Sequence, residues 1–93
     1  MLNIGLSVRG LEIEFDTARA LAETVMSKHP SQVMLVAWFD RQRGKESPQV
    51  PECQHKPGWL AYAEGHGGDI RIDINNGDYI FIFSSSPSSS PSP

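Results

Sequence analysis

The chain has 93 residues, a length that fits one domain and excludes a multidomain enzyme or a long repeat array. Its 8 basic and 11 acidic residues give a net charge of −3, so the chain has no basic excess with which to bind a nucleic-acid backbone. The longest apolar run, Val33 to Phe39, is much shorter than the roughly 20 residues of a membrane-spanning helix, which argues against a membrane protein.

Two runs of alternating apolar residues open the chain and indicate strands. The first run contains Ile4, Leu6 and Val8, and the second contains Leu11, Ile13 and Phe15. A two-residue turn at Arg9 and Gly10 would place both runs on one face of a sheet. We therefore expect an antiparallel hairpin in this segment.

A helix is expected to follow the hairpin. Asp16 suits its N-cap position, because a carboxylate there accepts hydrogen bonds from the free N–H groups of the first turn. Apolar residues then recur at helical spacing along one side: Ala18, Leu21, Ala22, Val25 and Met26. Pro30 stops the pattern, which predicts a helix of about three turns.

The middle of the chain combines a buried strand with a long irregular segment. Every residue from Val33 to Phe39 is apolar, which predicts a strand inside the sheet with both faces buried. Residues 41–58 are rich in proline, glycine and charge, which predicts a loop. A loop of that length without its own secondary structure is uncommon in a compact domain and is often functional.

Three further strands are expected near 59–64, 69–75 and 78–83. Asn76 and Gly77 form a strong turn signal, and this turn pairs Ile74 with Tyr79. The period of residues 59–64 is ambiguous, so a short helix is the alternative there.

These elements predict an α+β fold in ββαβββ order. It has a mainly antiparallel sheet of about five strands, with one helix packed on one face. The opposite face would carry Leu60, Tyr62, Ile80 and Ile82, and an apolar face of this kind is rarely left in water. Either the 41–58 loop or a second subunit should cover it, and the second possibility predicts a homodimer.

Four residues after the middle strand suggest a metal site: Cys53, His55, Glu64 and His66. Zinc accepts all of these ligand types, and Asp69 lies near them in the sequence. Their spacing matches no standard zinc motif. The alternative is that His55 and His66 are solvated loop residues and that Cys53 is a small packing residue.

The same region permits two kinds of enzyme site. Cys53 could act as a nucleophile with His66 as its base, although no family-type signature surrounds the cysteine. A small-molecule pocket could instead lie between the 41–58 loop and the sheet, lined by Trp59, Tyr62 and His66. Neither pattern is specific, and we assign no catalytic or cofactor-binding residue.

Three longer runs of sequence resemble a small prokaryotic domain family of unknown function. They are residues 47–53, residues 57–68 and residues 73–83. The resemblance covers residues 1–83 and implies a free-standing bacterial or archaeal protein, without transferring any site residue. Residues 84–93 contain only serine and proline, so we expect them to form a flexible tail outside this single domain.

The favoured interpretation is a non-catalytic binding or assembly module with a protein partner, a homodimer in the simplest case. Its binding surface would be the second sheet face or the 41–58 loop. The alternatives are a small zinc protein and a small-molecule enzyme. Since a single cysteine cannot form an intrachain disulfide and no export signal is visible, we expect a cytoplasmic protein.

Overall fold

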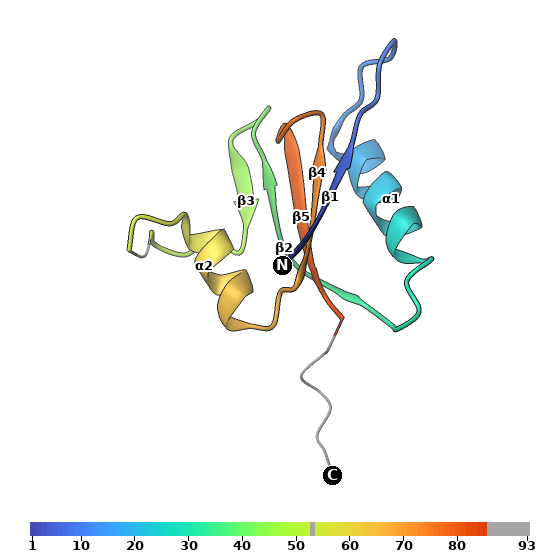
Figure 1. Cartoon of the computed structure of the whole chain (residues 1–93). Coiled ribbons are helices and arrows are strands. Elements are labelled where there is room, and N and C mark those ends of the chain that lie inside the picture. Colours follow the sequence, from blue (N-terminus) through green and yellow to red (C-terminus); the bar gives the residue numbers. More distant parts are fainter. Residues whose placement is uncertain (53, 86–93) are drawn as a thin grey trace.

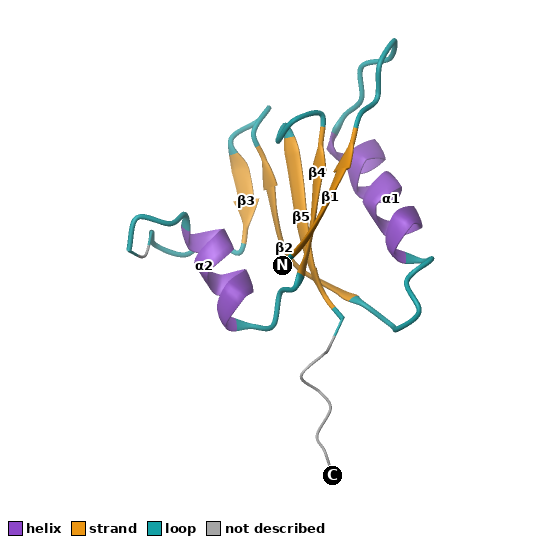
Figure 2. Cartoon of the chain, in the orientation of Figure 1, coloured by secondary structure: helices purple, strands orange, loops and turns teal. Residues whose placement is uncertain are grey.

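The strands form one sheet with a helix on each side. In the computed structural model, which describes residues 1–52 and 54–85, the elements are β1 (Leu2–Leu6), α1 (Phe15–Met26), β2 (Met34–Asp40), β3 (Lys45–Ser47), α2 (Gly58–Gly65), β4 (Ile70–Ile74) and β5 (Tyr79–Ser84). The strand order across the sheet is β1-β4-β5-β2-β3, and the helices lie on opposite faces (Figures 1 and 2). None of the helices in these two ranges is long and apolar enough to cross a membrane.

The sheet is mixed, so the predicted antiparallel ββαβββ arrangement is wrong. β1 runs parallel to β4, whereas the other neighbouring strands are antiparallel. The element order is βαββαββ, with β1 and β2 separated by two inserted strands. The predicted α+β class and five strands are present among the described residues.

The predicted N-terminal hairpin is also wrong, because only its first run is a strand. β1 finds its partner in β4, where Leu2 lies opposite Ile70. The second run is not a strand, but Ile13 and Phe15 still pack against the core, Ile13 from a loop and Phe15 from the start of α1. Phe15 is the first residue of α1, and its ring centroid lies 4.5 Å from that of Trp38.

Helix α1 confirms the apolar stripe that the sequence predicts. Ala18, Ala22 and Met26 are buried against the sheet. The helix begins at Phe15, so Asp16 lies in its first turn, and Glu14 occupies the N-cap position without a side-chain hydrogen bond. A negative charge in the first turn remains favourable for the helix dipole.

The β4–β5 hairpin has the predicted register. Ile74 lies opposite Tyr79, and Ile72 lies opposite Phe81. The turn places Asn75, Asn76 and Gly77 at positive φ, which asparagine and glycine tolerate better than other residues. β2 lies between β5 and β3, as its continuous apolar sequence predicts.

Residues 59–64 form a helix, which was the alternative to the predicted strand. Helix α2 buries Trp59 and Ala63 against the sheet face that contains Ala37, Ile80 and Ile82. The strand position beside β4 is taken by β1. The part of the second face over β2 and β5 is therefore covered by this chain itself, by a helix that directly follows the 41–58 segment. That segment also contains β3, so it is not a continuous loop.

Candidate functional site

The predicted metal ligands have separate environments. Glu64 forms an ion pair with Lys56, with 2.7 Å between Oε1 and Nζ. His66 lies at the C-cap of α2, and His55 is exposed in a turn at positive φ. Within residues 1–52 and 54–85, no group of three histidine, cysteine or acidic side chains is arranged to hold a metal. Cys53 lies outside the described residues, so the zinc site stays a prediction.

The aromatic residues of the predicted small-molecule pocket serve the packing of α2. Trp59 is 4% exposed, and its ring stacks on that of Phe39 with 5.4 Å between centroids. The imidazole of His66 stacks on Tyr62 at 3.9 Å, and its Nδ1 lies 2.9 Å from the Tyr62 carbonyl oxygen. Trp59 thus belongs to the core, and His66 closes the end of the helix.

A cleft of about 720 Å³ lies beside the β2–β3 and β4–β5 turns, and buried polar groups stabilise its wall. The Asp40 carboxylate is fully buried and accepts hydrogen bonds from the backbone N–H and Nε of Arg43. The Tyr79 hydroxyl donates to the Ile13 carbonyl, and burial raises the pKa of this tyrosine. Both groups have partners within the chain: Asp40 stabilises the β2–β3 turn, and Tyr79 fixes the segment before α1.

The open edge of β1 offers backbone groups that no other strand of the described residues uses. Leu2 donates its N–H to the Asp69 carbonyl at 2.8 Å, and the Leu6 carbonyl accepts from the Asn75 N–H at the same distance. In a parallel ladder, alternate residues direct their backbone groups toward the same neighbour. Asn3 and Gly5 therefore direct their N–H and C=O groups away from β4.

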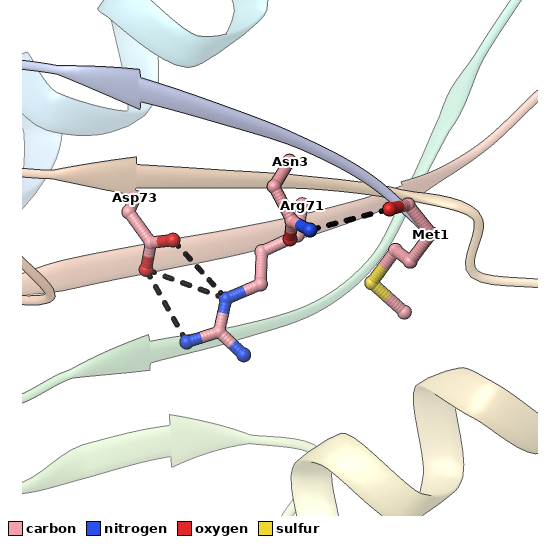
Figure 3. A network of polar contacts seen from close by, with 4 residues as sticks. All are labelled: Met1, Asn3, Arg71 and Asp73. Atoms are coloured by element: carbon pink, nitrogen blue, oxygen red, sulfur yellow. Dashed lines mark hydrogen bonds and ion pairs between the residues drawn. The ribbon is translucent and has the colours of Figure 1, made fainter.

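One face of this edge is polar. Asn3, Gly5 and Ser7 of β1 and its continuation share a hollow of about 590 Å³ with Arg71 and Asp73 of β4. The Arg71 guanidinium bonds the Asp73 carboxylate through Nε and one terminal nitrogen at 3.2–3.3 Å, as Figure 3 shows. Asn3 donates to the Met1 carbonyl beside this pair (Figure 3). Neither helix lies here, because α1 packs on β5 and α2 packs on β2.

The opposite face of the edge is apolar and only partly covered. Ile4 and Leu6 pack beside the core under α1 and are half-buried, whereas Leu2 is 55% exposed. The strand therefore presents an apolar side and a polar side to anything that lies against it.

The β1 edge has none of the usual protection against strand pairing. Edge strands are commonly protected by charged side chains, proline or a bulge. Residues 1–8 contain no charged side chain and no proline, and the β1–β4 register is regular. Sequence reasoning missed this site, because the absence of charge is visible in the sequence but the position of β1 at an edge depends on its distant partner.

The described elements define a small α+β protein whose mixed sheet carries one helix on each face. The chain belongs to the family named Domain of unknown function (DUF5619), which it matches over residues 1–83. This match confirms the resemblance that the sequence motifs indicate.

A solved structure shares the fold. The crystal structure of the novel protein AF1514 from Archeoglobus fulgidus DSM 4304 has a TM-score of 0.79 and 27% sequence identity to this chain. The similarity covers 92% of this chain and 95% of that chain. No curated protein matches the chain.

Proposed function

We propose that the protein is a binding and assembly module that adds an extended polypeptide strand to its β1 edge. The observation that carries this proposal is the pair of outward-facing backbone positions, Asn3 and Gly5, on an edge without charge or proline. In binding by strand addition, main-chain hydrogen bonds provide affinity, and side chains on the two faces provide specificity.

The two faces of the edge define the chemistry of the incoming strand. Its apolar residues would lie beside Leu2 and Ile4, on the face where α1 packs, and extend the apolar layer. Its alternate residues would lie beside Asn3, in the hollow that contains Arg71 and Asp73. A strand that alternates apolar and uncharged polar residues fits both faces.

Amide chemical shifts of the ¹⁵N-labelled full chain test this binding mode. The probe is a capped peptide that alternates threonine and valine, added in increasing excess over the chain so that it also displaces any strand already paired with the β1 edge. We expect the largest shift changes at the amides of Asn3 and Gly5, since these would donate to the added strand. Changes centred on β3 would contradict the proposal.

A matched pair of variants at one position separates the backbone from the side chain. Asn3→Pro removes the outward N–H and leaves the hydrogen bonds between β1 and β4 intact, because none of them uses that group. Asn3→Ala removes only the amide side chain. Peptide binding should be lost in Asn3→Pro and retained in Asn3→Ala, and equal binding by both variants would overturn the proposal.

A further inference from the structure

We propose that the strand received by β1 is β1 of a second copy of this chain, paired antiparallel about a two-fold axis at Ile4. This inference rests on strand addition at β1 and names its partner. The result would be a homodimer in which two five-stranded sheets join into one continuous sheet.

The register follows from the alternation of the strand. Only pairings that keep apolar residues opposite apolar residues preserve both faces. The centre of Leu2–Leu6 is Ile4, so full overlap of two strands places Ile4 opposite Ile4 of the second copy. Leu2 then faces Leu6 of the second copy on the apolar side, where α1 packs.

The same register satisfies the outward backbone groups. Asn3 lies opposite Gly5 of the second copy, and Gly5 lies opposite Asn3 of that copy. Because both residues point away from β4, each such pair exchanges two N–H···O=C hydrogen bonds. The pair at Ile4 is then a non-hydrogen-bonded pair, the kind in which side chains approach most closely.

Gly5 is a position that the isolated chain does not explain. A Cβ placed on it would meet no atom within 4 Å, and its φ is not in the left-handed region. Glycine inside a strand is unfavourable, and it often marks a site where another group approaches closely. An approach from outside the chain gives this glycine a role.

The polar face brings no unpaired charge to the contact, because Arg71 forms an ion pair with Asp73 of its own chain. Asn3 pairs with Arg71, and Gly5 pairs with Asp73, across the β1–β4 ladder. In the dimer register four residues therefore lie in one row. They are Arg71 and Asn3 of one copy, followed by Gly5 and Asp73 of the second copy. The two ends are three strand spacings apart, about 14 Å. With the ends this far apart, each Arg71–Asp73 ion pair stays within its own copy.

Like charges do not oppose the contact. Residues 1–8 carry no charged side chain, so two copies of β1 bring no like-charged side chains face to face. Helix α2 packs on β2, away from this edge, and α1 lies on the apolar face with Ile4 and Leu6, so the polar face of the edge carries no helix.

Disulfide cross-linking measures the register directly. In a Cys53→Ser background, Ile4→Cys places two thiols opposite each other, with Cβ atoms about 4.5–5.5 Å apart in an antiparallel pair. Leu2→Cys is the matched control, because Leu2 faces Leu6 and not itself, although it is the more exposed of the two positions. Under mild oxidation we expect Ile4→Cys to form a covalent dimer, and Leu2→Cys to do so only when mixed with Leu6→Cys.

Native mass by light scattering over a concentration series gives the second readout. The wild-type chain should be a dimer, and Asn3→Pro should raise the dimer dissociation constant about 100-fold by removing two symmetry-related hydrogen bonds. Circular dichroism should show that the Asn3→Pro monomer remains folded.

The results of these experiments distinguish self-pairing of β1 from strand addition by another polypeptide. A wild-type monomer at all concentrations, with no more cross-linking of Ile4→Cys than of Leu2→Cys, would overturn the second copy as the partner. If the threonine–valine peptide still shifts the amides of Asn3 and Gly5, strand addition stands without self-pairing. If it does not, both proposals fall.

Discussion

The two edges of the sheet differ in their protection against pairing with another chain. At the β3 edge the strand has three residues, carries Lys45 and Glu46, and is followed by Pro48. At the β1 edge the strand has five residues, and neither charge nor proline interrupts it. Short length, charge and proline are the features by which natural sheets avoid pairing with other chains.

The chain also anchors the segment beyond β3 and leaves the side of β1 free. After β3 the backbone passes Val50 and returns to Gly58 at the start of α2, where the two segments lie in close contact. Among the described residues, no strand lies beyond β1 in the sheet. The open edge is therefore a specific property of β1 and not a general feature of a small sheet.

The largest effect should come from breaking the anchored side. In Gly58→Ala the new Cβ would lie 1.9 Å from the Val50 carbonyl oxygen, a backbone atom that cannot rotate away. We expect a loss of about 2–3 kcal/mol in the free energy of unfolding. Urea denaturation of the variant and the wild type measures it.

Gly5→Ala is the matched control on the open side. Its Cβ would meet no atom within 4 Å, so stability should stay within about 0.5 kcal/mol of the wild type. If both alanine variants unfold at the same urea concentration, the close contact at Gly58 does not hold the segment in place.

A smaller effect is expected at the β2–β3 turn, which supports the protected edge. Asp40→Ala removes the acceptor of two hydrogen bonds from Arg43, one from its backbone N–H and one from its guanidinium. Because the Arg43 guanidinium is largely exposed and water can replace part of the interaction, we expect a loss of about 1–2 kcal/mol. The same urea measurement applies.

Asp78→Ala is the comparison for this turn. Asp78 pairs with the exposed Arg41 guanidinium at the neighbouring hairpin. The Asp78 side chain is 24% exposed, against 1% for Asp40, so its ion pair is more solvated and the loss should be below about 1 kcal/mol. A larger loss for Asp78→Ala than for Asp40→Ala would show that burial of the carboxylate is not what makes the β2–β3 turn stable.

Local sequence patterns predicted the parts of the fold that depend on near neighbours. The stripe of α1 follows from helical spacing, and the β4–β5 register follows from the Asn76-Gly77 turn together with the alternation around it. In both elements the residues that pair or pack are close in the sequence, so the pattern itself contains the answer.

The errors arise where distant segments compete for one position. Residues 11–15 alternate like a strand, yet Ile13 and Phe15 reach the core from a loop and a helix, because β4 already pairs with β1. Residues 59–64, which the sequence predicts as a strand next to 69–75 in the chain, form helix α2, and β1 occupies the position beside β4. The two candidates for that position are β1, which is far from β4 in the sequence, and residues 59–64, whose period is ambiguous. No local pattern shows which of them pairs with β4.

The candidate site was unpredictable for the same reason. Residue types alone pointed to cysteine and histidine chemistry, whereas the feature that carries the proposal is backbone geometry at Asn3 and Gly5. The N-terminal run without charged side chains is visible in the sequence. Its position at a sheet edge, however, depends on a parallel pairing with residues nearly 70 positions away.

The smallest effect is expected where side-chain hydrogen bonds join the start of β4 to the end of β5. Asp69 accepts hydrogen bonds from the Ser85 hydroxyl at 2.5 Å and from the Ser85 N–H at 2.9 Å, and these bonds hold the pKa of Asp69 below its ordinary value. A carboxyl group with a lowered pKa in the folded state stabilises the fold fully above the unfolded value of about 3.9. This contribution is lost as the pH falls from that value through the folded pKa.

Ser85→Ala removes the hydroxyl donor and keeps the N–H donor, so it should reduce but not abolish this acid-dependent contribution. Urea unfolding at pH 7 and near pH 3 measures the difference between the variant and the wild type at each pH. We expect a difference at pH 7 that narrows at the lower pH, because the protonated carboxyl group no longer gains from the lost donor. A difference that widens in acid would show that Ser85 stabilises the β4–β5 end by packing and not through the Asp69 carboxylate.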